Sequence, residues 1–209
     1  MTLVRIGHAG PDPALVARGR RLEYLTLGWN VVEGIVSVVA GALAGSASLV
    51  GFGVDSFIES LSGGVLLWRL QDGEEGEARE RLALRLVGIS FLLLAAYVAW
   101  ESVEKLVTRE GPGSSPLGIA IAALSLVVMP ILARAKRRVA SGLGSRALHA
   151  DSRQTDLCAY LSAILLVGLA LNAAFGWWWA DPVAGVAMTP IIVKEGIDAL
   201  RGERCACEK

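Results

Sequence analysis

The sequence contains few cysteines and few histidines, and this shortage argues against several classes of protein. Its three cysteines, Cys158, Cys205 and Cys207, are an odd number without the spacing of a disulfide framework. Only two of the 209 residues are histidines, and neither belongs to an HExxH motif or to a Ser/His/Asp grouping. We therefore expect neither a disulfide scaffold nor an enzyme.

Charged residues are also scarce. They make up 19% of the chain, whereas soluble domains contain about 25%. Hydrophobic residues reach 54%, and the mean hydropathy is +0.53. The formal net charge is zero, so that overall charge gives no indication of a nucleic-acid partner. The composition predicts a membrane protein whose main partner is the lipid bilayer.

Six stretches are long and apolar enough, or nearly so, to cross the hydrocarbon core, which takes about 20 residues of helix. We predict an all-α membrane protein, a six-transmembrane-helix bundle over residues 23–202. An N-terminal arm (1–22) precedes this domain, and a short cysteine-containing tail (203–209) follows it. The predicted spans are 23–44, 47–69, 82–106, 116–135, 148–173 and 178–200.

Positive charges are unevenly divided between the two sets of connections. Three of the connections contain only Lys105 and Arg109, whereas the arm, the tail and the other two connections are rich in Arg and Lys. Cytoplasmic segments carry this excess, so both termini are predicted to be cytosolic. The arm also lacks the apolar core and cleavage site of a signal peptide. The basic residues of the fourth-to-fifth connection are Arg134, Lys136, Arg137, Arg138 and Arg146.

Acidic side chains lie inside two of the predicted spans. In "GVDSFIES" Asp55 and Glu59 are four residues apart, which makes them neighbours on one helix face. In "WNVVEG" Asn30 and Glu33 are one turn apart. A carboxylate at mid-bilayer depth costs several kcal/mol unless it has a partner or faces water. These residues therefore need either a structural partner or a ligand.

The fifth span begins with "HADSRQTDLCAY", in which Asp151, Gln154 and Cys158 occupy positions i, i+3 and i+7. This spacing makes one stripe on a helix, whereas Asp156 points elsewhere. Zn²⁺ takes about four ligands, and a cysteine thiolate shifts the preference towards zinc, cadmium or copper(I). The sequence predicts a metal site made of Asp55, Glu59, Cys158, Gln154 and Asp151, with Glu33 and Asn30 as accessory or proton-coupling residues.

Structural explanations remain open for several of these residues. The two acids of the second span could form an ion pair with Arg69 or Arg153. Glu33 could face a water-filled vestibule without binding anything, and Asn30 suits a hydrogen bond between membrane helices. A lone cysteine such as Cys158 is typical of a small buried hydrophobe.

The tail ends in "CACEK", where Cys205 and Cys207 are two residues apart. This pair could capture a soft metal transiently, although it lacks the spacing of a closed four-ligand site. An inert tail fits the sequence equally well. A membrane-embedded metal sensor or chaperone built around this pair is one alternative to a transporter, and a membrane-embedded enzyme is another.

Four segments, in this order, resemble the cation diffusion facilitator family of divalent-metal transporters: "AGSASLVGFGVDSFIESLSGG", "AWESVEKLV", "HADSRQTDLCAYLSA" and "WWWADPVAGVAMTPIIVKEGIDALRG". The resemblance covers most of residues 23–202. It implies a multi-pass exporter in the inner (plasma) membrane that exchanges a divalent cation for protons and forms a homodimer. The metal would be cargo rather than a cofactor, with Zn²⁺ expected first and Cd²⁺, Co²⁺ or Fe²⁺ as alternatives.

Carried over by position, the family's second-span acid pair falls on Asp55 and Glu59. Its fifth-span His-x-x-x-Asp pair falls on Gln154 and Cys158, and this departure leaves the identity of the metal open. Glu33 occupies a position that is usually apolar in the family, and could be a compensating ligand or proton carrier. The resemblance also leads us to expect that the family's C-terminal ferredoxin-like domain is absent, so that dimerisation would depend on the membrane helices.

Overall fold

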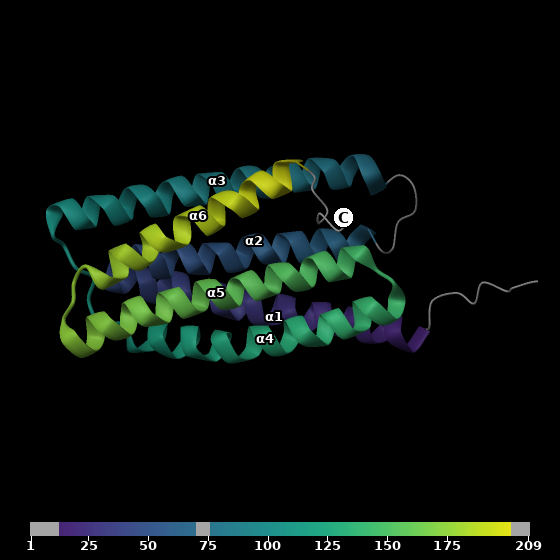
Figure 1. Cartoon of the computed structure of the whole chain (residues 1–209), viewed down its shortest axis with the longest axis horizontal. Coiled ribbons are helices and arrows are strands. Elements are labelled where there is room, and N and C mark those ends of the chain that lie inside the picture. Colours follow the sequence, from purple (N-terminus) through teal and green to yellow (C-terminus); the bar gives the residue numbers. More distant parts are fainter. Residues whose placement is uncertain (1–12, 70–75, 202–209) are drawn as a thin grey trace, which may run out of the picture.

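A computed structural model describes residues 13–69 and 76–201 of the chain, and within these ranges it forms six α-helices and no strand (Figure 1). Each helix contains nearly all of one predicted span, which confirms the all-α bundle. The predicted tail pair Cys205 and Cys207 lies outside the described residues. The helices are α1 (Pro13–Ala44), α2 (Ala47–Arg69), α3 (Gly76–Thr108), α4 (Pro116–Leu143), α5 (Arg146–Phe175) and α6 (Ala180–Arg201).

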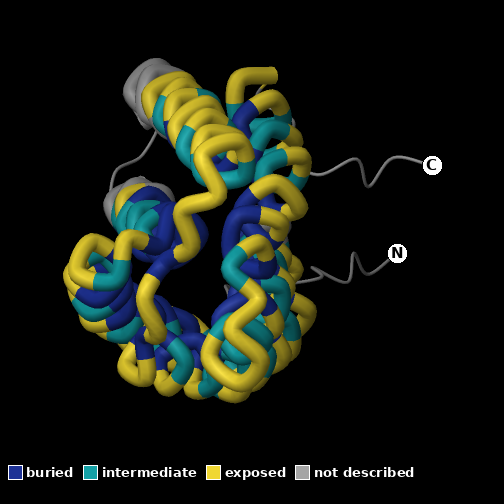
Figure 2. The backbone as a smooth tube through the Cα atoms, turned by 90° about the vertical axis from the view of Figure 1, so that its left-hand side faces the viewer, coloured by how far each residue is buried: buried dark blue, intermediate teal, exposed yellow. Residues whose placement is uncertain are grey.

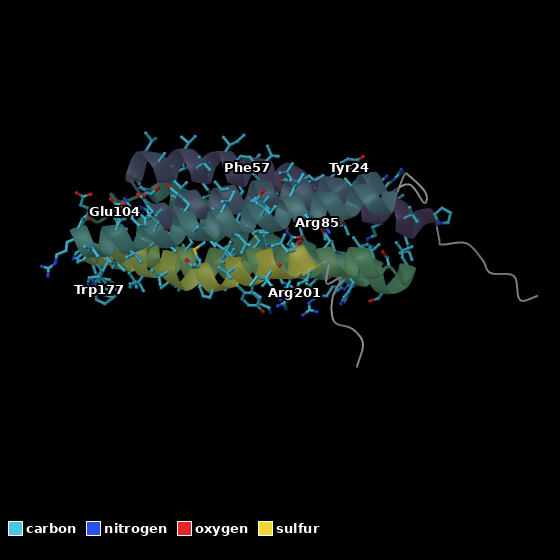
Figure 3. The ribbon with its side chains drawn as sticks, turned by 90° about the horizontal axis from the view of Figure 1, so that it is seen from above. Tyr24, Phe57, Arg85, Glu104, Trp177 and Arg201 are labelled. Atoms are coloured by element: carbon cyan, nitrogen blue, oxygen red, sulfur yellow. The ribbon has the colours of Figure 1, made fainter. Side chains whose placement is uncertain are left out.

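Consecutive helices run in opposite directions along the length of the bundle, so that the start of α1 and the end of α6 lie at the same end (Figure 1). In this arrangement α1 packs against α2 and α4, α4 packs against α5, and α3 packs against α6. α2 contacts α3, α5 and α6, which places it between the two sides of the bundle. Trp177 and Glu104 mark one end, and Arg85 and Arg201 lie towards the other (Figure 3).

The outside of the bundle is apolar. Figure 2 shows buried residues on the inner sides of the helices and exposed residues mainly on the outer sides. Large apolar side chains such as Leu43, Leu93 and Trp100 are exposed there. Three helical segments of the described chain are long and apolar enough to span a membrane: Pro13–Ala44, Pro116–Leu143 and Asp151–Phe175. This surface and these helices are those of a multi-pass membrane protein.

Local sequence signals fix where several helices begin and end. The side chains of Ser115 and Ser145 accept hydrogen bonds from backbone N–H groups three residues later, and so cap the starts of α4 and α5. α4 and α5 end at Gly144 and Gly176, whose φ angles of 61° and 65° lie in the left-handed region that favours glycine. These caps keep the connections short and the neighbouring helices antiparallel.

Some helices extend beyond the predicted spans. α1 begins ten residues before the predicted span, inside the expected arm 1–22, and α4 continues to Leu143 instead of ending near residue 135. Hydropathy locates only the part of a helix that prefers lipid, whereas backbone hydrogen bonds can continue beyond it. One prediction is therefore wrong: Arg134, Lys136, Arg137 and Arg138 do not lie in a basic connection but inside α4. Of these residues, Lys136 is completely buried.

α1 and α2 pack unusually closely because glycines face the neighbouring backbone. A Cβ atom at Gly53 would lie 2.8 Å from the backbone N of Val38, and one at Gly41 would lie 2.7 Å from the backbone N of Val50. Both distances are too short for a side chain, so only glycine permits this approach. The turn that follows α1 contains Gly45 with a φ of 65°. This packing fixes the part of α2 that carries Asp55.

The start of α2 is also held to α6 by a buried polar cluster. Ser46 donates a hydrogen bond to Asp181 Oδ1 at 2.7 Å, and the hydroxyl of Ser48 donates to the same oxygen. Asp181 is completely buried in the first turn of α6, where the N–H groups at the helix start favour a carboxylate. The cluster fixes the position of α6 against α2.

Candidate cation-binding site

A small cavity lies among α2, α3, α5 and α6 and has room for about one water molecule, with a volume of about 10 Å³. Asp55 and Glu59 of α2 line it together with Gln154 and Cys158 of α5. Residues about 100 positions apart in the sequence therefore meet at one place, as the two predicted stripes require. The remaining lining residues are Glu195 and the apolar Phe91, Leu157, Leu161, Ile191 and Ile192.

The polar residues of the cavity are deeply buried. Asp55 is 6% exposed, Glu59 is 4% exposed and Cys158 is 2% exposed. They are brought inward because α2 presents Phe52, Asp55, Ser56 and Glu59 on the face that packs into the bundle. Buried ionisable side chains inside membrane helices generally serve a substrate pathway or pair with each other.

Hydrogen bonds connect the cavity to neighbouring helices. Thr155 donates to Glu59 Oε1 at 3.2 Å, while the other carboxylate oxygen of Glu59 has no partner among the described residues. The thiol of Cys158 donates to Glu33 Oε1, with a sulfur–oxygen distance of 3.8 Å. Both oxygens of Glu33 also lie 3.1 Å from the hydroxyl of Ser125. Glu33 therefore lies beside the cavity, in contact with one lining residue, without lining it.

Asp151 belongs to a different cluster from the cavity. It forms a salt bridge with Lys136, whose ammonium group also lies 3.1 Å from Glu23 Oε2 and 3.5 Å from the hydroxyl of Thr155. We call Lys136, Glu23, Asp151 and Thr155 the lysine cluster. Since Thr155 also binds Glu59, the lysine cluster is connected to the cavity through one hydroxyl.

The structure also shows where the other predicted polar residues lie. Asn30 is completely buried, and neither of its side-chain polar atoms has a hydrogen-bond partner among the described residues. Asp156 forms a salt bridge with Arg137 at the side of α5 away from the cavity. The ion pair considered for the acids of α2 is not formed with Arg153: this side chain is exposed, and no salt bridge among the described residues joins it to Asp55 or Glu59. The side chain of Arg69 lies outside the described part of the chain.

The separation of the side chains limits what this conformation can bind. Across residues 13–69 and 76–201, no three Asp, Glu, Cys or His side chains lie close enough to hold one metal ion together. The cavity therefore collects donors of suitable chemistry without presenting a formed coordination shell. Coordination would require side-chain rotation or a small approach of α5 towards α2, and such changes on binding are common.

Reasoning from the sequence missed three important residues. Glu23, Lys136 and Glu195 lie near the ends of the predicted spans, where charged side chains are usually solvated. A signal was available for one pair, because Lys136 and Glu23 are a cation and an anion at the same predicted side of the membrane. No sequence pattern shows that both side chains are enclosed.

Residues 24–202 match the family of the cation efflux transmembrane domain. The chain belongs to the cation efflux family. This membership confirms the resemblance drawn from the four sequence segments, and it means that the chain is a member of a family of transporters rather than of enzymes. Six helices and a cavity lined by buried acids are consistent with a cation efflux domain.

Individual relatives agree with this membership. The chain is 28% identical over 183 residues to an uncharacterized transporter of Methanocaldococcus jannaschii, covering 83% of this chain and 64% of the relative. It is 25% identical to transmembrane protein 163 of Xenopus laevis, covering 86% and 65%. It is 23% identical to the cation-efflux pump FieF of Shewanella oneidensis, covering 78% and 58%. The chain thus spans less than two thirds of the length of these relatives.

Proposed function

We propose that this chain exports a divalent metal ion across the inner (plasma) membrane in exchange for protons. The observation that supports this most strongly is the shared cavity, because it gathers Asp55, Glu59, Gln154 and Cys158 from two helices distant in sequence. Membership of the cation efflux family supports a cation as the cargo of this cavity. Both termini are then on the cytosolic side, in accordance with the charge asymmetry of the connections.

The donor set points to a metal of intermediate softness. Asp55 and Glu59 offer carboxylate oxygens, Gln154 offers a neutral amide oxygen, and Cys158 offers a sulfur. Carboxylate oxygens alone suit hard cations, whereas a thiolate favours Zn²⁺ and Cd²⁺ over Co²⁺ and Fe²⁺. Zn²⁺ is therefore the proposed cargo, and Cd²⁺ is the expected competitor.

Proton exchange follows from the chemistry of these ligands. Cysteine binds a metal as the thiolate, so that a proton must leave Cys158 when the metal arrives. Glu33 is the hydrogen-bond acceptor of this thiol, and it is therefore the proposed first recipient of that proton. From Glu33 this proton would pass to the cytosol, and release of the metal on the other side would let the thiol take up a different proton from that side, so that a proton moves inwards as the metal moves outwards.

We also propose that two copies of the chain associate through their membrane helices. Large apolar side chains on α3, among them Trp100 and Val107, are exposed in the single chain and could pack against a second copy as well as against lipid. The mass of the purified chain in lipid nanodiscs tests this, since a monomer throughout the working concentration range would contradict it.

Transport into proteoliposomes with an imposed pH gradient and a panel of divalent metals tests the proposal. Asp55→Asn and Glu59→Gln should each abolish uptake of Zn²⁺, while Glu104→Gln removes an exposed carboxylate and should leave uptake unchanged. Equal uptake by all four proteins would contradict the proposed site. Uptake that is independent of the pH gradient would contradict proton exchange alone. Deletion of residues 205–209 should leave transport intact, whereas a sensor built on the tail would lose its function.

A further inference from the structure

The cavity has a third acidic side chain, which the two-helix site of Asp55, Glu59, Gln154 and Cys158 does not use. Glu195 belongs to α6, and it lines the same cavity as the acid pair of α2. Unlike that pair it is only partly buried, so it lies at the more accessible side of the cavity. A ligand that enters from this side would meet Glu195 before it reaches the buried carboxylates.

The backbone at Glu195 has a fixed position, because α6 packs tightly on α3 at the neighbouring residue Gly196. A Cβ atom at Gly88 would lie 2.8 Å from the carbonyl oxygen of Gly196, and one at Gly196 would lie 3.1 Å from the carbonyl oxygen of Gly88. These two glycines allow the backbones to approach closely and leave little freedom for α6 to shift. Ile192, one turn before Glu195, is 1% exposed and anchors the same face of α6 in the core. The packing thus fixes the backbone of α6 at the point where Glu195 lines the cavity.

The charges around the cavity favour a cation. Asp55, Glu59 and Glu195 bring three carboxyl groups to the lining of the cavity, and Glu33 lies beside it in contact with Cys158. Several acids gathered around a small cavity produce a local negative potential that a divalent cation relieves.

We propose that Glu195 is a further metal-binding residue of this transporter, which takes up the divalent cation at the accessible side of the cavity and shares it with Asp55. This inference rests on the proposed function, because it assigns a third helix to the same site. Gln154 supplies only a neutral amide oxygen to the site. Glu195 adds a carboxylate oxygen from a third helix, and this increases the negative charge available to a bound cation. The glutamate side chain has three rotatable bonds, which allow the carboxylate to close onto a bound ion.

Binding of Zn²⁺ to the full chain in lipid nanodiscs, measured by titration calorimetry, tests this role. Glu195→Gln should raise the apparent Kd about tenfold, and Glu195→Asp, which keeps the charge, should restore most of the affinity. Asp198→Asn is the matched control, because it removes a carboxylate from the same helix less than one turn away. Asp198 does not line the cavity but lines a separate groove between α3 and α6. This control should bind as the wild type does. Thermal midpoints without metal verify that all the variants are folded.

The outcomes separate this inference from the proposed function. If Asp55→Asn loses Zn²⁺ binding while Glu195→Gln binds like the wild type, the role of Glu195 is overturned and the two-helix site stands. If Glu195→Gln and Asp198→Asn weaken binding equally, the effect is one of general surface charge and the specific role is also overturned. If the wild type itself binds no divalent metal, both the proposed function and this inference fail.

Discussion

The ammonium group of Lys136 on α4 lies 3.1 Å from a carboxylate oxygen of Glu23 on α1, and both side chains are buried inside the bundle. The same ammonium group forms a salt bridge with Asp151 on α5. One positive charge therefore serves two acids from two other helices, at the end of the bundle where the connections are rich in Arg and Lys. This arrangement stabilises α1, α4 and α5 against one another only while all three partners are present.

Replacement of Lys136 by methionine should strongly destabilise the protein. It leaves Glu23 and Asp151 as buried acids without a cation, and breaking a buried ion pair on one side costs about 3–5 kcal/mol. Thermal unfolding of the detergent-purified protein should show a clearly lower midpoint. Arg138→Met, which removes an exposed charge from the same helix, is the control and should unfold like the wild type.

A compensated variant makes this prediction sharper. When Glu23→Gln and Asp151→Asn are added to Lys136→Met, no charged group remains in the lysine cluster, and much of the lost stability should return. A triple variant as unstable as Lys136→Met alone would show that the packing of the lysine stem, rather than its charge, is what the bundle requires.

Replacement of Cys158 by serine should change metal preference more than it changes folding. The substitution keeps a small buried side chain and removes the sulfur donor, so that affinity for Cd²⁺ should fall by about tenfold or more while affinity for Co²⁺ changes little. Competition binding of the two metals measures this ratio. The control is the double variant Cys205→Ser with Cys207→Ser, which should leave the ratio of the two affinities unaltered. If Cys158→Ser also leaves this ratio unaltered, the thiol of Cys158 is not a metal ligand.

Gly53→Ala, which adds a methyl group to α2, should impair transport. Its Cβ atom would meet the backbone N of Val38 and the carbonyl oxygen of Gly34, which cannot move independently, so α2 would be displaced from α1 close to Asp55. Gly28→Ala is the matched control on α1, because nothing lies within 4 Å of the added atom. The rates of uptake into proteoliposomes should therefore differ between these variants. Equal rates would mean that the close contact of α1 and α2 is not required for the site.

Much of this protein could be predicted from its sequence because the signals are local. Apolar length predicts the helices, and helical periodicity puts Asp55 beside Glu59. The same periodicity excluded Asp156 from the stripe of Asp151, Gln154 and Cys158. Each of these inferences needs only the geometry of one helix.

Other features depended on which helices become neighbours, and no local pattern contains that information. Asp151 shares a helix face with Gln154 and Cys158, yet it lies one turn closer to Lys136 and pairs with it instead of lining the cavity. Glu195 joins the site only because α6 crosses beside α2 and α5. The sequence by itself determined the helices and the polar faces that they carry. The tertiary structure decided which buried acids pair with a lysine and which surround the cavity, because a buried charge is stabilised by whatever group the packing places within a few ångströms of it.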